Sequence, residues 1–262
     1  MKRESLIAIA TLALLILTIT IEGLVPTQTT ILDPLKELVS ELPRIPFKFA
    51  HPWSILVYSE HKSLMDIGNR PLKLVLLAEG CAVEISESKE LAYEVKAYTS
   101  PWSANWKVKT DLMEVDDVNV LFIRVVGVSV ILRLNPRIMT AINVSGSGFM
   151  LKANLEDLNR TSFSIEVSGA TVTLDLKYNE VFMTNLTIRV KGGVVKGDIQ
   201  VPKETAIYAE ATSYSSLVKI NIITNDFKTL KILTGRSSVG EPGGLHILVY
   251  SESSTVSLNA KW

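Results

Sequence analysis

A five-residue pattern, I-x-V-x-G, occurs four times along the chain and constrains its fold more than any other feature. The copies span residues 123–127, 142–146, 165–169 and 188–192, so their starts lie 19, 23 and 23 residues apart, and weaker echoes follow at 209–213 and 232–236. Alternating Ile and Val place two β-branched side chains on one face of a strand, and glycine allows a turn geometry that other residues resist. One such unit cannot bury its apolar face, so we expect neighbouring units to stack around a continuous core.

The rest of the chain after residue 50 also has the pattern of short strands. Alternating, β-branched segments at 55–59, 72–77, 82–85, 91–97 and 118–126 predict strands, and the series continues to 256–258. A hydrophobic fraction of 47% with only 21% charged residues excludes a disordered chain. The predicted fold class is therefore all-β, with residues 51–262 forming a stacked, toastrack-like β-solenoid ectodomain.

The first 25 residues have the features of a signal anchor or a signal peptide. Lys2 and Arg3 precede an uncharged run at 5–21, which is longer than the roughly 7 to 15 residues of a typical signal-peptide core and near the minimum of roughly 17 that spans a bilayer. No clear small-residue cleavage site follows, so we favour an uncleaved transmembrane helix that anchors the body outside the cytoplasm. If the segment is cleaved, the protein is secreted.

Residues 26–50 are predicted to form a stalk and one short helix. Polar residues at 27–30 suit a stalk, and Asp33 followed by Pro34 suits a helix start. The apolar residues at 35–42 fall on one face and Pro43 ends the helix. This apolar stripe is expected to pack as a lid on the body.

Two further stretches support the repeat and carry a resemblance to a known family. Residues 192–202 begin with two glycines, continue with a segment predicted to be a strand, and end with a proline. Residues 80–95 look like the opening units of a stack. With the I-x-V-x-G copies, they make residues 72–223 resemble the toastrack-type β-solenoid of the putative adhesin family. That resemblance implies a membrane-anchored or envelope-associated protein, and it supplies no catalytic residue.

One six-residue sequence, ILVYSE, occurs at 55–60 and again at 247–252, near the two ends of the body. We expect the two copies to be equivalent strands that cap or close the stack, because exposed strand edges must be hidden.

The sequence contains no motif that identifies an enzyme, a metal site or a cofactor. Cys81 is the only cysteine, and the three histidines lack metal-ligand spacing. Residues 235–240 resemble a phosphate-binding loop but lack its lysine, and they are predicted to form a long surface turn. Lys plus Arg equals Asp plus Glu at 27 each, which disfavours nucleic acid as a partner. We therefore predict no catalytic residues, no cofactor and no metal.

Two sets of residues are candidates for contact with glycans. Tyr98, Trp102 and Trp106 would share one face if their segment were a single strand, and could then stack on sugar rings. Three asparagines begin N-x-[ST] sequons and are candidate N-glycosylation sites, namely Asn143, Asn159 and Asn185.

The predicted function is a non-enzymatic, membrane-anchored, extracytoplasmic module that is adhesin-like or structural in the cell envelope. Its expected partners are the membrane, through the N-terminal helix, and an envelope protein or polysaccharide. Three alternatives remain open at this point: an accessory ectodomain for envelope sensing or signalling, a fibre subunit that exchanges strands at exposed edges, and a solenoid enzyme that acts on polysaccharide.

Overall fold

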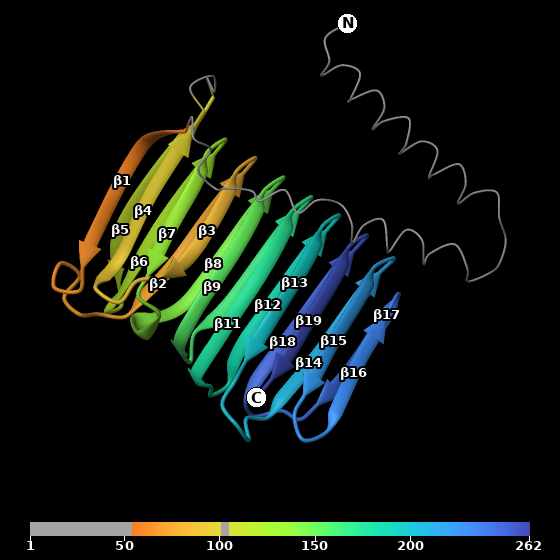
Figure 1. Cartoon of the computed structure of the whole chain (residues 1–262). Coiled ribbons are helices and arrows are strands. Elements are labelled where there is room, and N and C mark those ends of the chain that lie inside the picture. Colours follow the sequence, from red (N-terminus) through yellow and green to blue (C-terminus); the bar gives the residue numbers. More distant parts are fainter. Residues whose placement is uncertain (1–53, 101–104) are drawn as a thin grey trace, which may run out of the picture. The chain divides into compact units, whose positions relative to one another are not determined.

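The computed structural model describes residues 54–100 and 105–262, which form an all-β body of two facing sheets (Figure 1). The predicted anchor, stalk and short helix at 1–50 lie outside these described residues, and so does Trp102. Within the described part, no helix is long and apolar enough to cross a membrane, and the one helical segment is the 3-10 turn η1 (Pro136–Ile138).

Sheet A contains ten of the described strands. In spatial order they are β1 (Ile55–Ser63), β4 (Leu91–Thr99), β7 (Ser129–Leu134), β3 (Ala82–Glu87), β9 (Met150–Asn159), β11 (Thr171–Glu180), β13 (Val194–Gln200), β19 (Thr255–Lys261), β15 (Leu217–Ile223) and β16 (Phe227–Ile232).

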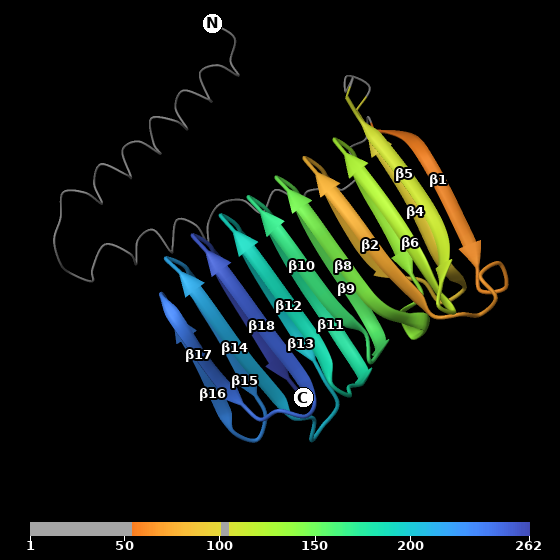
Figure 2. The same cartoon turned by 180° about the vertical axis from the view of Figure 1, so that it is seen from behind.

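Sheet B contains the nine other described strands, which Figure 2 shows from the opposite side. In spatial order they are β17 (Gly235–Gly240), β14 (Ile207–Tyr214), β18 (Leu245–Glu252), β12 (Thr184–Lys191), β10 (Ser162–Ser168), β8 (Met139–Ser147), β2 (Leu72–Glu79), β6 (Val118–Val126) and β5 (Lys107–Val115).

The repeating unit of the described body is one strand of sheet B, a tight turn and one strand of sheet A, and we call this unit a rung. Strands of neighbouring rungs pair in parallel, as β10 does with β8 and β12. Along each strand buried and exposed residues alternate, so one row of side chains faces the core and the other faces solvent. The rungs, in spatial order, are β6–β7, β2–β3, β8–β9, β10–β11, β12–β13, β18–β19 and β14–β15.

The turn inside each rung has a residue with left-handed backbone at its first position. Gly169 has φ +56°, and its N–H donates to the carbonyl of Lys191 in the next rung at 2.8 Å. Because this conformation is costly for residues with a Cβ, glycine dominates the position. The seven positions are Gly80, Gly127, Gly148, Gly169, Gly192, Ser215 and Ser253.

The strand register corrects one copy of the sequence repeat. Ile165 pairs with Val144 rather than with Ile142, so the copy at 142–146 starts two residues too early, and its rung turns at Gly148 instead of Gly146. The echo at 209–213 is displaced in the same way. The true stack of buried side chains runs through Ile123, Leu76, Val144, Ile165, Ile188, Val249 and Ala211.

The rungs do not follow one another in chain order. The β2–β3 rung lies between β6–β7 and β8–β9, and the β18–β19 rung lies between β12–β13 and β14–β15 (Figure 1). The expectation that the two ILVYSE copies are equivalent strands is therefore wrong. The first copy lies in β1 at the edge of sheet A, whereas the second lies in β18, which is paired on both sides within sheet B.

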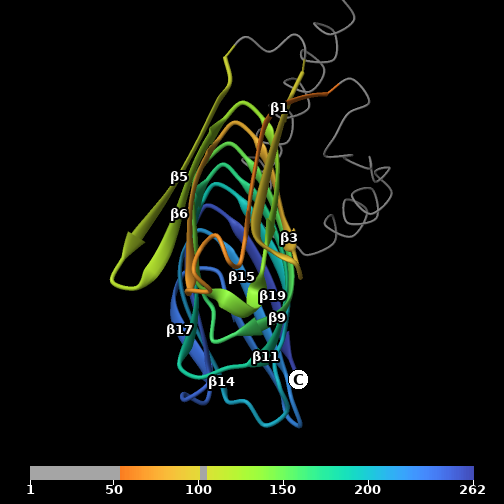
Figure 3. The same ribbon diagram turned by 90° about the vertical axis from the view of Figure 1, so that its left-hand side faces the viewer.

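Antiparallel strands close both ends of the described stack. At one end β1 and β4 extend sheet A and β5 extends sheet B, with the β5–β6 hairpin projecting from the body (Figure 3). At the other end β16 and β17 pair with β15 and β14. The surface turn predicted at 235–240 is thus wrong, since these residues form β17, and the echo at 232–236 is where the chain passes from β16 to β17.

Candidate functional site

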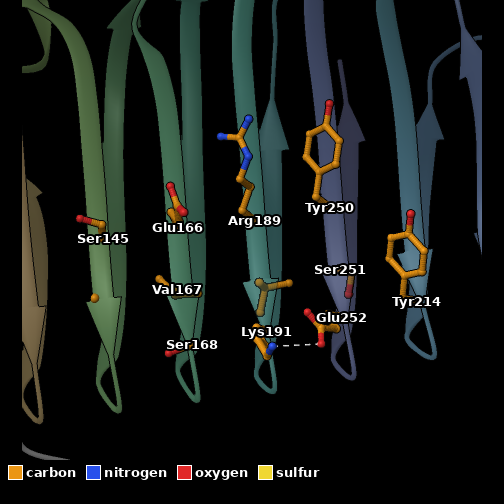
Figure 4. Close-up of a pocket in the computed structure, with 12 residues that line it drawn as sticks. Ser145, Glu166, Val167, Ser168, Arg189, Lys191, Tyr214, Tyr250, Ser251 and Glu252 are labelled. Atoms are coloured by element: carbon orange, nitrogen blue, oxygen red, sulfur yellow. Dashed lines mark ion pairs between the residues drawn. The ribbon is translucent and has the colours of Figure 1, made fainter.

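The candidate site is a shallow groove of about 700 Å³ on the solvent face of sheet B. It crosses five neighbouring parallel strands near their carboxyl ends, in the order β8, β10, β12, β18 and β14 (Figure 4). Because neighbouring strands are about 4.8 Å apart, the four steps between these strands give the groove a length of roughly 19 Å.

Side chains enter the groove in two rows that the parallel register aligns. The upper row contains Ser145, Glu166, Arg189 and Tyr250, which are register partners from β8 to β18. The lower row lies two residues further along each strand and contains Ser168, Lys191, Glu252 and Tyr214. Figure 4 shows both rows on the same side of the sheet. Each of these residues occupies an outward position of its strand, so the pairing of the strands gathers their side chains on one face.

Two contacts order the centre of the groove. The Arg189 guanidinium carbon lies 5.2 Å from the centroid of the Tyr250 ring, which is a cation–π arrangement. Lys191 Nζ lies 3.1 Å from Glu252 Oε1 in the lower row. Both pairs join β12 to β18, which are neighbours in sheet B although they are far apart in the sequence.

The two tyrosines present accessible aromatic surface. Tyr214 is 65% exposed and Tyr250 is 41% exposed, although large aromatic side chains are usually covered in a folded protein. Tyr214 follows Tyr250 diagonally, one strand away and one outward position further along. The groove therefore offers aromatic rings beside charged and hydroxyl groups.

Gly146 distorts β8 at one end of the groove. Its φ is +151°, and a Cβ atom placed there would lie 1.7 Å from the carbonyl oxygen of Ala78 on β2. Only glycine permits β2 and β8 to approach in this way.

The prediction that Tyr98, Trp102 and Trp106 share one face required them to lie on a single strand, and the structure does not have that strand. Tyr98 lies on β4 in sheet A, and Trp106 immediately precedes β5 in sheet B, so the segment is not one strand. Trp106 is 39% exposed and Tyr98 is partly exposed. Binding of sugars by these residues stays a prediction.

The three sequon asparagines lie on solvent-facing positions. Asn143 on β8 and Asn185 on β12 lie on the same face of sheet B as the groove, and Asn159 ends β9 in sheet A. The Asn143 sequon ends at Ser145, which lines the groove. Glycosylation of these sites stays a prediction.

The described residues contain no group of three or more His, Cys, Asp or Glu side chains that could hold a metal ion. Burial raises the pKa of the Cys81 thiol to about 12, which keeps it protonated at neutral pH. His246 on β18 accepts a hydrogen bond from the Gly243 N–H at 3.3 Å, and its ring lies 5.7 Å from that of Tyr208.

Sequence reasoning missed the groove residues, although a signal for them existed. Glu166 and Arg189 are the second letters of their I-x-V-x-G copies, and Tyr250 occupies the same position in the β18 rung. A comparison of the second positions of the repeat copies would have shown charged side chains at Arg124, Glu166 and Arg189, whereas Tyr250 lies outside those copies.

The fold and the groove together define a class: an all-β protein of stacked parallel rungs with a side-chain-lined groove on one face. No protein-family model and no curated protein matches the chain. Among solved structures it is similar to one described as a "putative cell adhesion protein" from Clostridium sporogenes ATCC 15579. The likeness covers 78% of this chain and 97% of that one, with 18% identity and a TM-score of 0.52. At this identity the likeness concerns the fold.

Proposed function

We propose that this protein is a non-enzymatic β-solenoid module of the cell envelope that attaches to envelope material through the groove on sheet B. The observation that carries the proposal is the groove itself, because its charged and aromatic side chains are exposed on a regular face of parallel strands. The similar solved structure, described as a putative cell adhesion protein, supports an adhesin-like role.

The location of the module follows from the N-terminal sequence. We propose that residues 1–25 hold the chain in the membrane and that the body lies outside the cytoplasm, since Lys2 and Arg3 precede the apolar run. Fractionation of the producing cells with intact mass spectrometry tests this. A membrane-bound species that keeps its N-terminus supports the anchor, and a soluble species beginning near Leu24 replaces it with secretion.

Attachment is tested by cosedimentation of the purified full-length protein, kept in non-ionic detergent, with envelope fragments whose lipid the same detergent has removed, so that residues 1–25 cannot hold the protein on the fragments. The double variant Arg189→Ala/Tyr250→Ala removes the central contact of the groove and should reduce the bound fraction severalfold. The matched control is Phe227→Ala, because Phe227 is 68% exposed on β16, outside the groove. If the double variant and the control bind as the wild type does, the groove is not the attachment site.

A further inference from the structure

The charges of the groove alternate in sign between neighbouring strands. In the upper row Glu166 lies beside Arg189, and in the lower row Lys191 pairs with Glu252. Two carboxylates and two cations give these four side chains no net charge, and together they supply hydrogen-bond donors and acceptors at short intervals. Such a surface suits a ligand whose own groups both donate and accept, as hydroxyl groups do.

The exposed tyrosines add stacking surface to this polar array. Sugar rings have apolar C–H faces and hydroxyl edges, so they match an aromatic ring that is surrounded by charged and hydroxyl groups. The contact of Arg189 with Tyr250 restrains that ring beside the upper row, while Tyr214 offers a second ring one strand further along. A ligand that contacts both tyrosines must run across the strands.

Other polymers fit the groove less well. An extended peptide cannot add as a strand, because β10, β12 and β18 are each paired on both sides within sheet B. A polyanion, such as nucleic acid or an acidic polysaccharide, would meet the carboxylates of Glu166 and Glu252 on the groove floor.

Resting on the proposed function, we infer that the ligand of the groove is a neutral, hydroxyl-rich polysaccharide chain that lies across β10, β12, β18 and β14. Its rings stack on Tyr250 and Tyr214. Its hydroxyl groups exchange hydrogen bonds with Glu166 and Arg189. The groove length of roughly 19 Å accommodates several sugar units rather than a single sugar.

The test is affinity electrophoresis of the full-length protein in non-ionic detergent. Gels contain either the neutral or the acidic polysaccharide fraction of the producing cells' envelope, separated by anion exchange. The neutral fraction should retard the wild type. Tyr214→Ala and Tyr250→Ala should each raise Kd about tenfold, which corresponds to ~1.4 kcal/mol. Phe227→Ala should bind as the wild type does, and thermal unfolding of each variant shows whether it is folded.

Each other outcome has a defined meaning. If only the acidic fraction retards the protein, the inference that the ligand is a neutral polysaccharide is overturned. If neither fraction retards the protein while envelope fragments still bind it, the ligand is not a polysaccharide, but the proposed function stands. If the fragments do not bind it either, both proposals fail.

Discussion

The hydroxyl group of Tyr93 on β4 donates a hydrogen bond of 2.7 Å to Oε1 of Glu60 on β1. The hydroxyl groups of Tyr58 and of Thr110 on β5 also bond to Glu60. One carboxylate therefore joins the two sheets at this end of the stack, since β1 and β4 belong to sheet A and β5 to sheet B. This polar contact adds to the apolar packing of Val57 on β1 and of Val108 and Leu112 on β5 against the core.

This contact makes the stability of the end formed by β1, β4 and β5 depend on pH. Burial would raise the pKa of Glu60, but the hydrogen bonds from Thr110, Tyr58 and Tyr93 outweigh burial and hold the pKa below its ordinary value of 4.5. A lowered folded-state pKa contributes stability that is present at neutral pH and is lost as the pH falls through that pKa.

We therefore expect Glu60→Gln to lower the free energy of unfolding at pH 7 by about 1 kcal/mol, allowing for solvent screening at this half-buried site. Urea unfolding of both proteins at pH 7 and pH 3 measures the difference, which should shrink at pH 3. Glu156→Gln is the control, because Glu156 forms an exposed ion pair with Lys177 at 3.6 Å and should change stability little at either pH. A difference that is equal at the two pH values would contradict this account.

Substitutions at the left-handed turn positions should either lower or raise the free energy of unfolding, depending on whether glycine is removed or introduced. Gly169→Ala should lower the free energy of unfolding by about 1 kcal/mol, because a Cβ at Gly169 meets no atom of the described residues within 4 Å and its φ of +56° is unfavourable. Ser253→Gly should raise it by a similar amount, since Ser253 has φ +48° at the equivalent position. Chemical denaturation measures both changes.

Gly146 should behave differently from Gly169. A Cβ at Gly146 would overlap the backbone of Ala78, so Gly146→Ala should be far more destabilising than Gly169→Ala. Equal effects of the two substitutions would show that the close approach of β2 and β8 is not retained in solution.

Ser251 is a stabilisation target beneath the groove. Its hydroxyl oxygen is fully buried and has no hydrogen-bond partner among residues 54–100 and 105–262, and its register partner on β12 is the buried Val190. Ser251→Val should raise the free energy of unfolding by about 1 kcal/mol, because it replaces an unsatisfied hydroxyl with apolar surface. Thermal unfolding tests this. A lower melting temperature would mean that the hydroxyl is satisfied or that the added methyl group does not fit.

The strand edges argue against fibre formation by strand exchange. Lysines lie on the edge strands β5 and β16, at Lys109 and Lys231 among others, and β1 pairs with β4 through two register shifts. Charged and irregular edges resist pairing with a second copy. Electron microscopy should show no fibres of the wild type, and Lys228→Val/Lys231→Val should increase association. Fibres of the wild type would restore the fibre-subunit alternative.

The sequence by itself determined the strands in which apolar and polar residues alternate, and the two faces of each of these strands. The alternation at 118–126 predicted β6 with its observed bounds, and the glycines after these strands predicted the turns, because side-chain period and backbone freedom are local properties. The prediction from sequence failed at 235–240, because few apolar residues alternate there. These residues form β17 because they pair with the edge of β14.

Only the tertiary structure decided which strands are neighbours. Repeat copies such as those at 142–146 and 165–169 can align in more than one register, and every rung presents a similar apolar face to its neighbours. Nothing local therefore specifies that β18 lies between β12 and β14 and brings Tyr250 beside Arg189. The groove depends on this arrangement, which is set by the packing of the complete core and by the closure of both ends of the stack, and these are properties of the whole chain.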